Sequence, residues 1–302
     1  MIRIFFKGFD QMIERLKAII RKAPDNYIVN LVISFLVNAF YRYTDKRKLL
    51  YGRNDRSNEI LNTNNPLISV YLPTYNRCKI LRDRAIPTVL SQTHKNFELV
   101  ICDDGSTDDT EAVVKSFNDP RIKYIKISRD KYRYPNKSFY HWFSGSVTAS
   151  NAALDKCNGA WSARIDDDCT WTNDHLEKLL DLAQKDDYEF VSSHLLVDLP
   201  GNKNITTHKD DIRNPTGIGS NLTWLYRGYL NEFKYSIHSW RKLYDRPNDA
   251  DFRYRIYKSG VRIGYLNEVT ASISPRPGDS GVGSEAYLAD TEKYEDFYGS
   301  KS

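Results

Sequence analysis

Two groups of aspartates could bind a metal ion or a phosphate, and each follows directly on an apolar run. Asp103 and Asp104 end one such run, and three consecutive aspartates at 166–168 end another. Adjacent carboxylates repel one another, and a divalent cation, which prefers hard oxygen ligands, would relieve that repulsion. The cation would bridge to the phosphates of a bound nucleotide. An aspartate-rich turn before the next helix is the purely structural alternative.

The segments around these aspartates alternate between β-type and helical patterns. Strands are expected at 67–72, 98–102, 122–127, 161–165 and 190–197, and helices at 77–92, 107–118, 146–157 and 172–184. Pro87 threatens to break the first helix. Such alternation predicts an α/β domain whose mostly parallel sheet is flanked by helices. Ligands bind at the carboxyl ends of such strands, where both aspartate groups lie.

Composition excludes several classes of protein. The chain has 302 residues, of which 40% are hydrophobic and 13% aromatic, enough to fill a core. Its four cysteines show no C-x-x-C spacing, which disfavours a zinc site or a disulfide framework and favours a reducing compartment. The sequence contains no Walker-type loop and no G-x-G-x-x-G after a strand, which disfavours a usual ATP or nicotinamide enzyme.

The positive charge is concentrated at the N-terminus. The first fifty residues hold ten Lys and Arg against four acids, a balance of +6, while the whole chain carries +5, which leaves −1 for the remainder. A nucleic-acid-binding domain would need a basic face on its body. We therefore expect no nucleic-acid partner.

The N-terminal segment has two predicted helices. Apolar residues recur at helical spacing between 5 and 20 with a basic side opposite, and a nearly apolar run follows at 27–41. That run is shorter than the roughly twenty residues a membrane span needs. The segment could lie in a membrane interface, or it could pack on the domain or on a second copy. We expect no signal peptide and a cytoplasmic protein. Such a protein could contact the inner face of the membrane at its periphery.

The predicted organisation has four parts. Residues 1–53 form the basic helical segment, 54–65 an Asn-rich linker, 66–275 the catalytic domain and 276–302 a C-terminal tail.

Several stretches resemble glycosyltransferase family 2. ISVYLPTYNR at 68–77 is similar to the family's first strand and loop, and SQT at 91–93 and FELVICDDGSTDDT at 97–110 continue the likeness in order. AALDKCNGAWSARIDDD at 152–168 resembles its helix, strand and D-x-D motif. The resemblance implies a GT-A fold, a Rossmann-like sheet here preceded by an N-terminal helical extension. It also implies an inverting, metal-dependent enzyme that uses a nucleotide-sugar donor.

The resemblance also implies roles for individual residues. The nucleotide would be bound by Pro73, Tyr75, Arg77, Asp104 and Asp167. The metal, Mn²⁺ or Mg²⁺, would be held by Asp168, with Asp166 acting through water.

The family's catalytic base is an Asp at the start of a later helix. Asp249 is the candidate here and Asp251 the second choice, although acids at a helix N-terminus also favour the helix dipole without any catalytic role. Asn248 stands where the family often has Glu. Among the aromatic residues of 199–245, Trp224 and Trp240 are candidates for contact with a sugar acceptor, with core packing as the alternative.

The chain departs from the family at two further places. Ser150 stands where the family often has Arg, and Arg129 or Arg133 could supply the missing contact. The loop 274–279 lacks the family's frequent His, a position that Asp279 could fill.

The expected function is transfer of a sugar, from a UDP-sugar, to a hydroxyl of a glycan or lipid-linked acceptor in surface polysaccharide synthesis. Two other readings remain open: a non-catalytic scaffold or membrane adaptor with this fold, and a nucleotidyltransferase. A nucleotidyltransferase would normally carry a Gly-rich basic loop where this chain has residues 73–76.

Overall fold

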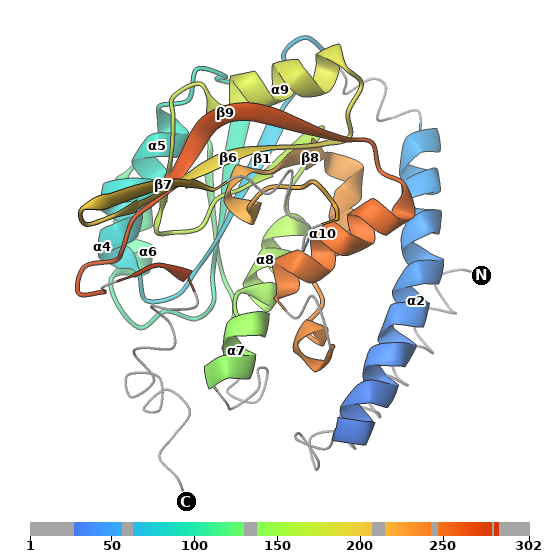
Figure 1. Cartoon of the computed structure of the whole chain (residues 1–302). Coiled ribbons are helices and arrows are strands. Elements are labelled where there is room, and N and C mark those ends of the chain that lie inside the picture. The colour runs from blue at the N-terminus through green and yellow to red at the C-terminus, as the bar shows by residue number, and fades with distance from the viewer. Residues whose placement is uncertain are drawn as a thin grey trace, which may run out of the picture.

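The computed structural model describes residues 27–55, 63–129, 138–206, 215–242, 247–279 and 281–283. Within them the chain forms a nine-stranded sheet with helices on both faces (Figure 1). The α/β architecture that the alternating sequence pattern predicts is therefore confirmed.

The sheet has a parallel half and a mixed half. Its order is β3-β2-β1-β4-β8-β6-β9-β5, with β7 paired to β6. The strands β3, β2, β1 and β4 run parallel to one another, and β6 runs parallel to β9. The strand β8 is antiparallel to β4 and β6, β5 is antiparallel to β9, and β7 is antiparallel to β6. The bounds are β1 Ile68–Thr74, β2 Phe97–Asp103, β3 Ile122–Lys126, β4 Trp161–Arg164, β5 Cys169–Trp171, β6 Phe190–Leu199, β7 Asn202–Thr206, β8 Leu225–Arg227 and β9 Ile263–Ile273.

Alternate residues of the central strands feed two separate cores. Val70 and Leu72 of β1 point into one cluster, and Tyr71 between them belongs to the other. All seven residues of β1 and of β2 are buried, as parallel strands covered on both faces must be. The central strands therefore hold rigidly whatever follows their carboxyl ends.

The first core is covered by helices that follow β1, β2 and β5. They are α4 (Cys78–Ile80), a π-helical turn (Leu81–Ala85), α5 (Ile86–Leu90), α6 (Thr110–Ser116) and α9 (His175–Lys185). Pro87 does not break the first of these helices. The wide π turn lies just before it, so the chain stays helical although Pro cannot donate a backbone bond.

The second core lies beneath α2, α8 and α10. The elements on this side are α2 (Tyr27–Asn54), α7 (Ser138–Ser144), α8 (Val147–Leu154), α10 (Asn248–Ser259) and 3-10 turns at Asn221–Thr223, Gly228–Phe233 and Ser239–Arg241. Figure 1 shows α2 beside α10 along one flank of the domain.

The C-terminal half of α2 is built into the domain. Leu49 is 1% exposed, and a side chain at Gly52 would meet the Tyr229 ring at 2.7 Å, so only glycine allows this approach. Arg53 donates two hydrogen bonds of 2.6 Å to the Glu189 carboxylate. Of the two alternatives for this helix, packing on the domain holds for its second half.

The N-terminal half of α2 presents an exposed apolar face. Its exposed residues are Tyr27, Ile28, Leu31, Val32, Phe35 and Leu36. Among the described helices, none combines the length and the apolar character that crossing a membrane requires. The helix predicted at 5–20 lies outside the described residues. The linker predicted from 54 begins inside α2, and its residues 56–62 also lie outside them.

Candidate active site

One pocket opens at the carboxyl ends of β1, β2 and β4, where the sheet packing brings the two aspartate groups together. It is lined by Pro73, Thr74, Tyr75, Arg77, Asp104, Arg129, His141, Trp142, Gly145, Ser146, Ala149, Arg164, Asp166, Asp167, Asp168 and Arg276. The list includes every nucleotide and metal residue expected from the sequence. The lining residues come from segments as far apart in the chain as Pro73 and Arg276, and the fold brings them together.

The two aspartates after β2 have different environments. Asp103 accepts from the backbone N–H of Ser106 at 2.7 Å and from the Tyr124 hydroxyl at 2.5 Å, and it closes the turn. Asp104 faces the pocket and pairs with Arg129 at 2.5 Å. Arg129 also lies over the Tyr75 ring, 4.0 Å from its centroid. A ring, a carboxylate and a guanidinium thus stand together at this end of the pocket.

Each member of the aspartate triplet has its own partner. Asp166 accepts from Arg164 Nε at 3.0 Å and from Asn221 at 3.3 Å, one on each oxygen. Asp167 accepts from the Thr74 hydroxyl at 3.0 Å. Burial, and then the charge of Asp168 next to it, raise the pKa of Asp167 to about 7. Four aspartates and four arginines line the pocket, so what distinguishes Asp167 is its burial beside another carboxylate and not an excess of negative charge.

These carboxylates fit a hard divalent cation. No group of three or more His, Cys, Asp or Glu side chains in the described part of the chain is arranged to hold a metal. A cation here would take one or two carboxylates, with water and phosphate as its other ligands, which is the usual mode for Mg²⁺. Protein donors already contact both oxygens of Asp166 and both oxygens of Asp168, the latter from Arg276 Nε at 3.1 Å and the Cys169 thiol at 3.6 Å, so a cation would displace one of these donors or bind through water.

An arginine stands in the C-terminal loop that lacks the family's histidine. Arg276 Nε lies 3.1 Å from Asp168 and 3.6 Å from Asp279. Arg84 holds this loop by donating to the carbonyls of Ser274 and Pro275 at 3.0 and 2.9 Å. Arg276 thus forms ion pairs with both Asp168 and Asp279.

Sequence reasoning missed three of the titratable lining residues. Arg276, Arg164 and His141 line the pocket, although none was a candidate. A charged residue inside an apolar strand was a signal for Arg164, which is 3% exposed. Arg276 carried no such signal, because only packing brings its loop to the pocket. Of the two arginines considered as replacements at Ser150, Arg129 lines the pocket and Arg133 lies outside the described residues.

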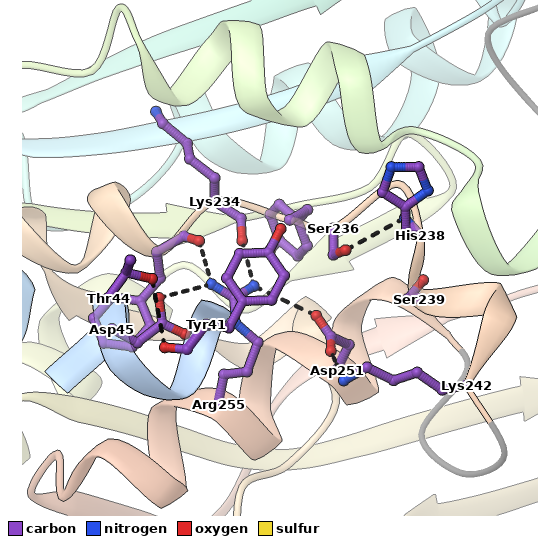
Figure 2. Close-up of polar contacts among 12 residues, drawn as sticks. Tyr41, Thr44, Asp45, Lys234, Ser236, His238, Ser239, Lys242, Asp251 and Arg255 are labelled. Carbon is purple, nitrogen blue, oxygen red and sulfur yellow. Dashed lines mark hydrogen bonds and ion pairs between the residues drawn. The ribbon is translucent and has the colours of Figure 1, made fainter. Parts of the chain in front are cut away.

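The two candidate bases differ sharply in environment. Asp249 is half-buried in the first turn of α10 and is not among the residues that line the pocket. Asp251 has no exposed surface and forms ion pairs with Lys242 and with Arg255 (Figure 2). A carboxylate held in this way cannot reach an acceptor, so we withdraw Asp251 as a candidate base.

Neither candidate tryptophan offers a free ring face. Trp224 is fully buried, donates to the Gly219 carbonyl at 2.9 Å and packs beside Phe190 and Phe252. Trp240 is 5% exposed and packs on Tyr140. Trp224 belongs to the second core and Trp240 packs against Tyr140 and Arg241, so both tryptophans follow the packing alternative. Trp142 is the tryptophan that lines the pocket.

Comparison with known proteins decides the family. The model of glycosyl transferase family 2 matches residues 69–242, more than half of the chain. The chain belongs to this family. The resemblance found in the motifs at 68–77, 97–110 and 152–168 is confirmed, and the parallel half of this glycosyltransferase sheet is the part that carries them.

Relatives and solved structures extend the comparison. The family 2 chain is 30% identical over 176 residues to the Escherichia coli UDP-Glc:alpha-D-GlcNAc-diphosphoundecaprenol beta-1,3-glucosyltransferase WfgD, covering 56% of this chain and 64% of that protein. The S. aureus TarS structure in complex with UDP-GlcNAc aligns with a TM-score of 0.55 at 19% identity, over 70% of this chain and 60% of that one. A mannosyltransferase from Pyrobaculum calidifontis, in complex with GDP-Man and Mn²⁺, aligns with a TM-score of 0.52 at 18% identity, over 83% and 69%. These structures show the shared fold, and the chain spans less than two thirds of WfgD.

Proposed function

We propose that this protein is an inverting glycosyltransferase that transfers a sugar from a UDP-sugar to a hydroxyl of a glycan or lipid-linked acceptor in surface polysaccharide synthesis. One observation carries the proposal. All seven residues that the family motifs mark for nucleotide and metal binding line a single pocket at the carboxyl edge of the parallel strands. The activity that the name of WfgD states, with UDP-Glc as donor and a diphosphoundecaprenol acceptor, supports the same donor and acceptor classes.

The base of the nucleotide binds at the end of the pocket formed by Tyr75 and Asp104. Asp104 accepts a hydrogen bond from the uracil ring, and Tyr75 stacks near it. Arg129 contacts both side chains and so fixes their orientation. Pro73 and Arg77 shape the loop beside them, and Asp167 lies near the ribose.

The diphosphate lies at the opposite end, against the triplet. Asp168 holds Mn²⁺ or Mg²⁺ directly and Asp166 does so through water. The cation, when bound, supplies Lewis-acid neutralisation of the charge that grows on the leaving diphosphate. Arg276, 3.1 Å from Asp168, adds a fixed positive charge from the C-terminal loop.

The acceptor hydroxyl is activated by Asp249. The carboxylate takes the hydroxyl proton while the acceptor oxygen forms a bond to the anomeric carbon. The bond from that carbon to the diphosphate oxygen breaks in the same step, with oxocarbenium character, and nucleoside diphosphate leaves. A single displacement inverts the anomeric configuration.

The acceptor class also favours contact with a membrane surface, on the cytoplasmic side. The exposed apolar half of α2 follows directly on residues 1–26, which hold six Lys and Arg against three acids. Apolar and basic groups together bind an interface that contains anionic lipid. Self-association through the same face is the competing outcome.

A panel of nucleotide sugars tests the proposed function. Binding and slow hydrolysis of UDP-, GDP- and dTDP-sugars are measured with Mn²⁺, with Mg²⁺ and with EDTA. We expect metal-dependent release of UDP, and none with EDTA. Absence of nucleotide binding with metal present would favour the scaffold reading, and pyrophosphate release from a nucleoside triphosphate would favour a nucleotidyltransferase.

A further inference from the structure

A buried chain of four charged side chains joins α2 to α10 and to the 3-10 turn at Ser239–Arg241 (Figure 2). Asp45 of α2 accepts from Arg255 Nε at 2.7 Å and from its Nη2 at 3.1 Å. Arg255 Nη1 lies 3.4 Å from Asp251, and Lys242 donates to the other oxygen of Asp251. All four side chains are less than a tenth exposed. Two acids and two bases balance, which is what makes burial of these charges tolerable.

Arg255 is held from several directions. Its guanidinium donates to the carbonyls of Phe233 and Lys234, the latter at 2.8 Å. It also lies over the ring of Tyr41 in α2, 3.6 Å from the centroid. The Asp45 carboxylate and the Tyr41 ring both belong to α2, so the position of Arg255 depends on α2. The rotation of α10, which carries Arg255, depends on α2 for the same reason.

The first turn of α10 is held against the wall of the pocket. Asn248 donates from its side chain to the carbonyls of Phe143 at 3.1 Å and of Gly145 at 3.2 Å, and Gly145 lines the pocket. Asp249 follows directly, between this contact and the buried Asp251. A change in the setting of α10 therefore moves Asp249 relative to the donor.

We propose that Asp45 is a positioning residue for sugar transfer, which holds α10 and its Asp249 in register with the pocket. The inference rests on the proposed function. Both α2 and α10 lie outside the segment 69–242 that the family model matches, so this device belongs to the flanking parts of the chain. The residues proposed to bind the nucleotide and the metal stand on other elements, so loss of Asp45 leaves donor binding intact.

The chain offers a matched control on the same helix. Arg53 also joins α2 to the domain, through an ion pair with the fully buried carboxylate of Glu189. Arg53 reaches α10 only at its far end, where it donates to the Gly260 carbonyl at 2.9 Å. A role of α2 in stability alone would give Asp45 and Arg53 variants the same defects.

The experiment compares full-length parent, Asp45→Asn, Asp45→Glu and Arg53→Gln proteins. The affinity for UDP with Mn²⁺, the kcat for hydrolysis of the UDP-sugar that the parent uses best, and the melting temperature are measured for each. We expect unchanged UDP affinity and a kcat lower by about ten- to a hundredfold in both Asp45 variants, since a displacement on the order of 1 Å costs that much. Arg53→Gln keeps its kcat even where its melting temperature falls.

Two results overturn the inference by itself. One is an Asp45→Glu or Asp45→Asn protein that keeps the parental kcat, and the other is a fall in kcat that Arg53→Gln reproduces. Asp45→Glu keeps the charge, so it decides the matter if Asp45→Asn does not fold. A parent that neither binds UDP nor hydrolyses any donor would instead overturn the proposed function, and the inference with it.

Discussion

Aspartates gather in two regions of this protein, and the regions treat them differently. In the pocket, the carboxylates at 166–168 are adjacent in the chain, and burial with the charge of Asp168 raises the pKa of Asp167 to about 7. In the network between α2 and α10, Asp45 and Asp251 stand on different helices and share Arg255 as a partner. Adjacent carboxylates invite a cation as ligand, whereas separated ones that share an arginine join elements of the fold.

The contrast is sharpest within a single helix turn. Asp249 and Asp251 are two residues apart in α10, and both are acids near its N-terminus. Only Asp251 is fully buried and ion-paired. Residue type and helix position therefore do not separate a proposed base from a structural carboxylate, and the partners do.

The largest expected effect concerns the proposed base. Asp249→Asn should lower the turnover of the donor by about two to four powers of ten, because the amide cannot accept the hydroxyl proton. UDP affinity should stay unchanged, since Asp249 does not line the pocket. Single-turnover kinetics with the best donor measures the first quantity and calorimetry the second. Near-normal turnover would show that another group removes the proton.

Removal of Asp168 tests the region of adjacent carboxylates. Asp168→Ala should reduce metal-dependent turnover at least about a hundredfold, because Lewis-acid neutralisation contributes several kcal/mol. The melting temperature without metal should change little, since repulsion within the triplet falls and Arg276 keeps Asp279 as a partner at 3.6 Å. Titration with Mn²⁺, followed by electron spin resonance, checks the loss of metal binding. Asp109 is an exposed acid between β2 and α6, and Asp109→Ala serves as the control. A large loss of stability would place Asp168 with the structural aspartates.

Removal of Arg255 tests the network between α2 and α10. Arg255→Met should lower the free energy of unfolding by about 3–5 kcal/mol, because the buried Asp45 loses its guanidinium partner and Asp251 keeps only Lys242. The double variant Asp45→Leu with Arg255→Met should recover part of this loss, since one unpaired charge disappears with it. Urea unfolding at pH 7 measures both. A single variant as stable as the parent would break the comparison.

The outer face of α2 provides a smaller effect. Ile28→Ser should weaken binding to vesicles of phosphatidylglycerol and phosphatidylethanolamine by about tenfold, because burial of one such side chain contributes about 1.5–3 kcal/mol. Ile28 is 69% exposed, and Ile205 on β7, at 60%, gives the matched control Ile205→Ser. Flotation measures the bound fraction. If Ile28→Ser changes only the oligomeric mass in solution, the face binds a second copy.

The smallest effect concerns a buried titratable group with a neutral partner. Burial lowers the pKa of His175 to about 3, and its Nδ1 meets the Thr270 hydroxyl at 2.7 Å. The unfolded chain takes up this proton near pH 6.5, so the contribution to stability is complete above pH 6.5 and is lost progressively as the pH falls toward 3. His175→Gln should reduce the pH dependence of the unfolding free energy below pH 6 by up to about 1.4 kcal/mol per pH unit. Urea unfolding at pH 7.5, 6 and 5 checks the slope, and an unchanged slope would contradict the assignment.

Most of the residues proposed to bind the nucleotide could be predicted, because each lies in or directly after a contiguous strand motif. The apolar runs of β1, β2 and β4 end directly in the residues that line the pocket, so strand prediction alone places Asp104 and the triplet at one sheet edge. The continuity of the helix through Pro87 was less accessible, since a π turn depends on hydrogen-bond geometry that residue type does not encode.

The residues expected to contact the acceptor could be predicted much less well. Trp224 and Trp240 are of the residue type that packs on sugar rings, yet both are buried, because Trp224 belongs to the second core beneath α10 and Trp240 packs on Tyr140. The partners of Asp251 come from α10 itself and from residue 242, and the chain is completed by Asp45, some two hundred positions away.

By itself, the sequence determined the family, the parallel half of the sheet and the aspartates at its edge, since each depends on a contiguous stretch of chain. The tertiary structure decided which aspartates are neutralised, which aromatic rings are buried and where Arg129, Arg164 and Arg276 stand around the pocket. The reason is physical: the charge and solvation of a side chain are set by the neighbours that packing brings within a few ångströms, and these come from anywhere in the chain.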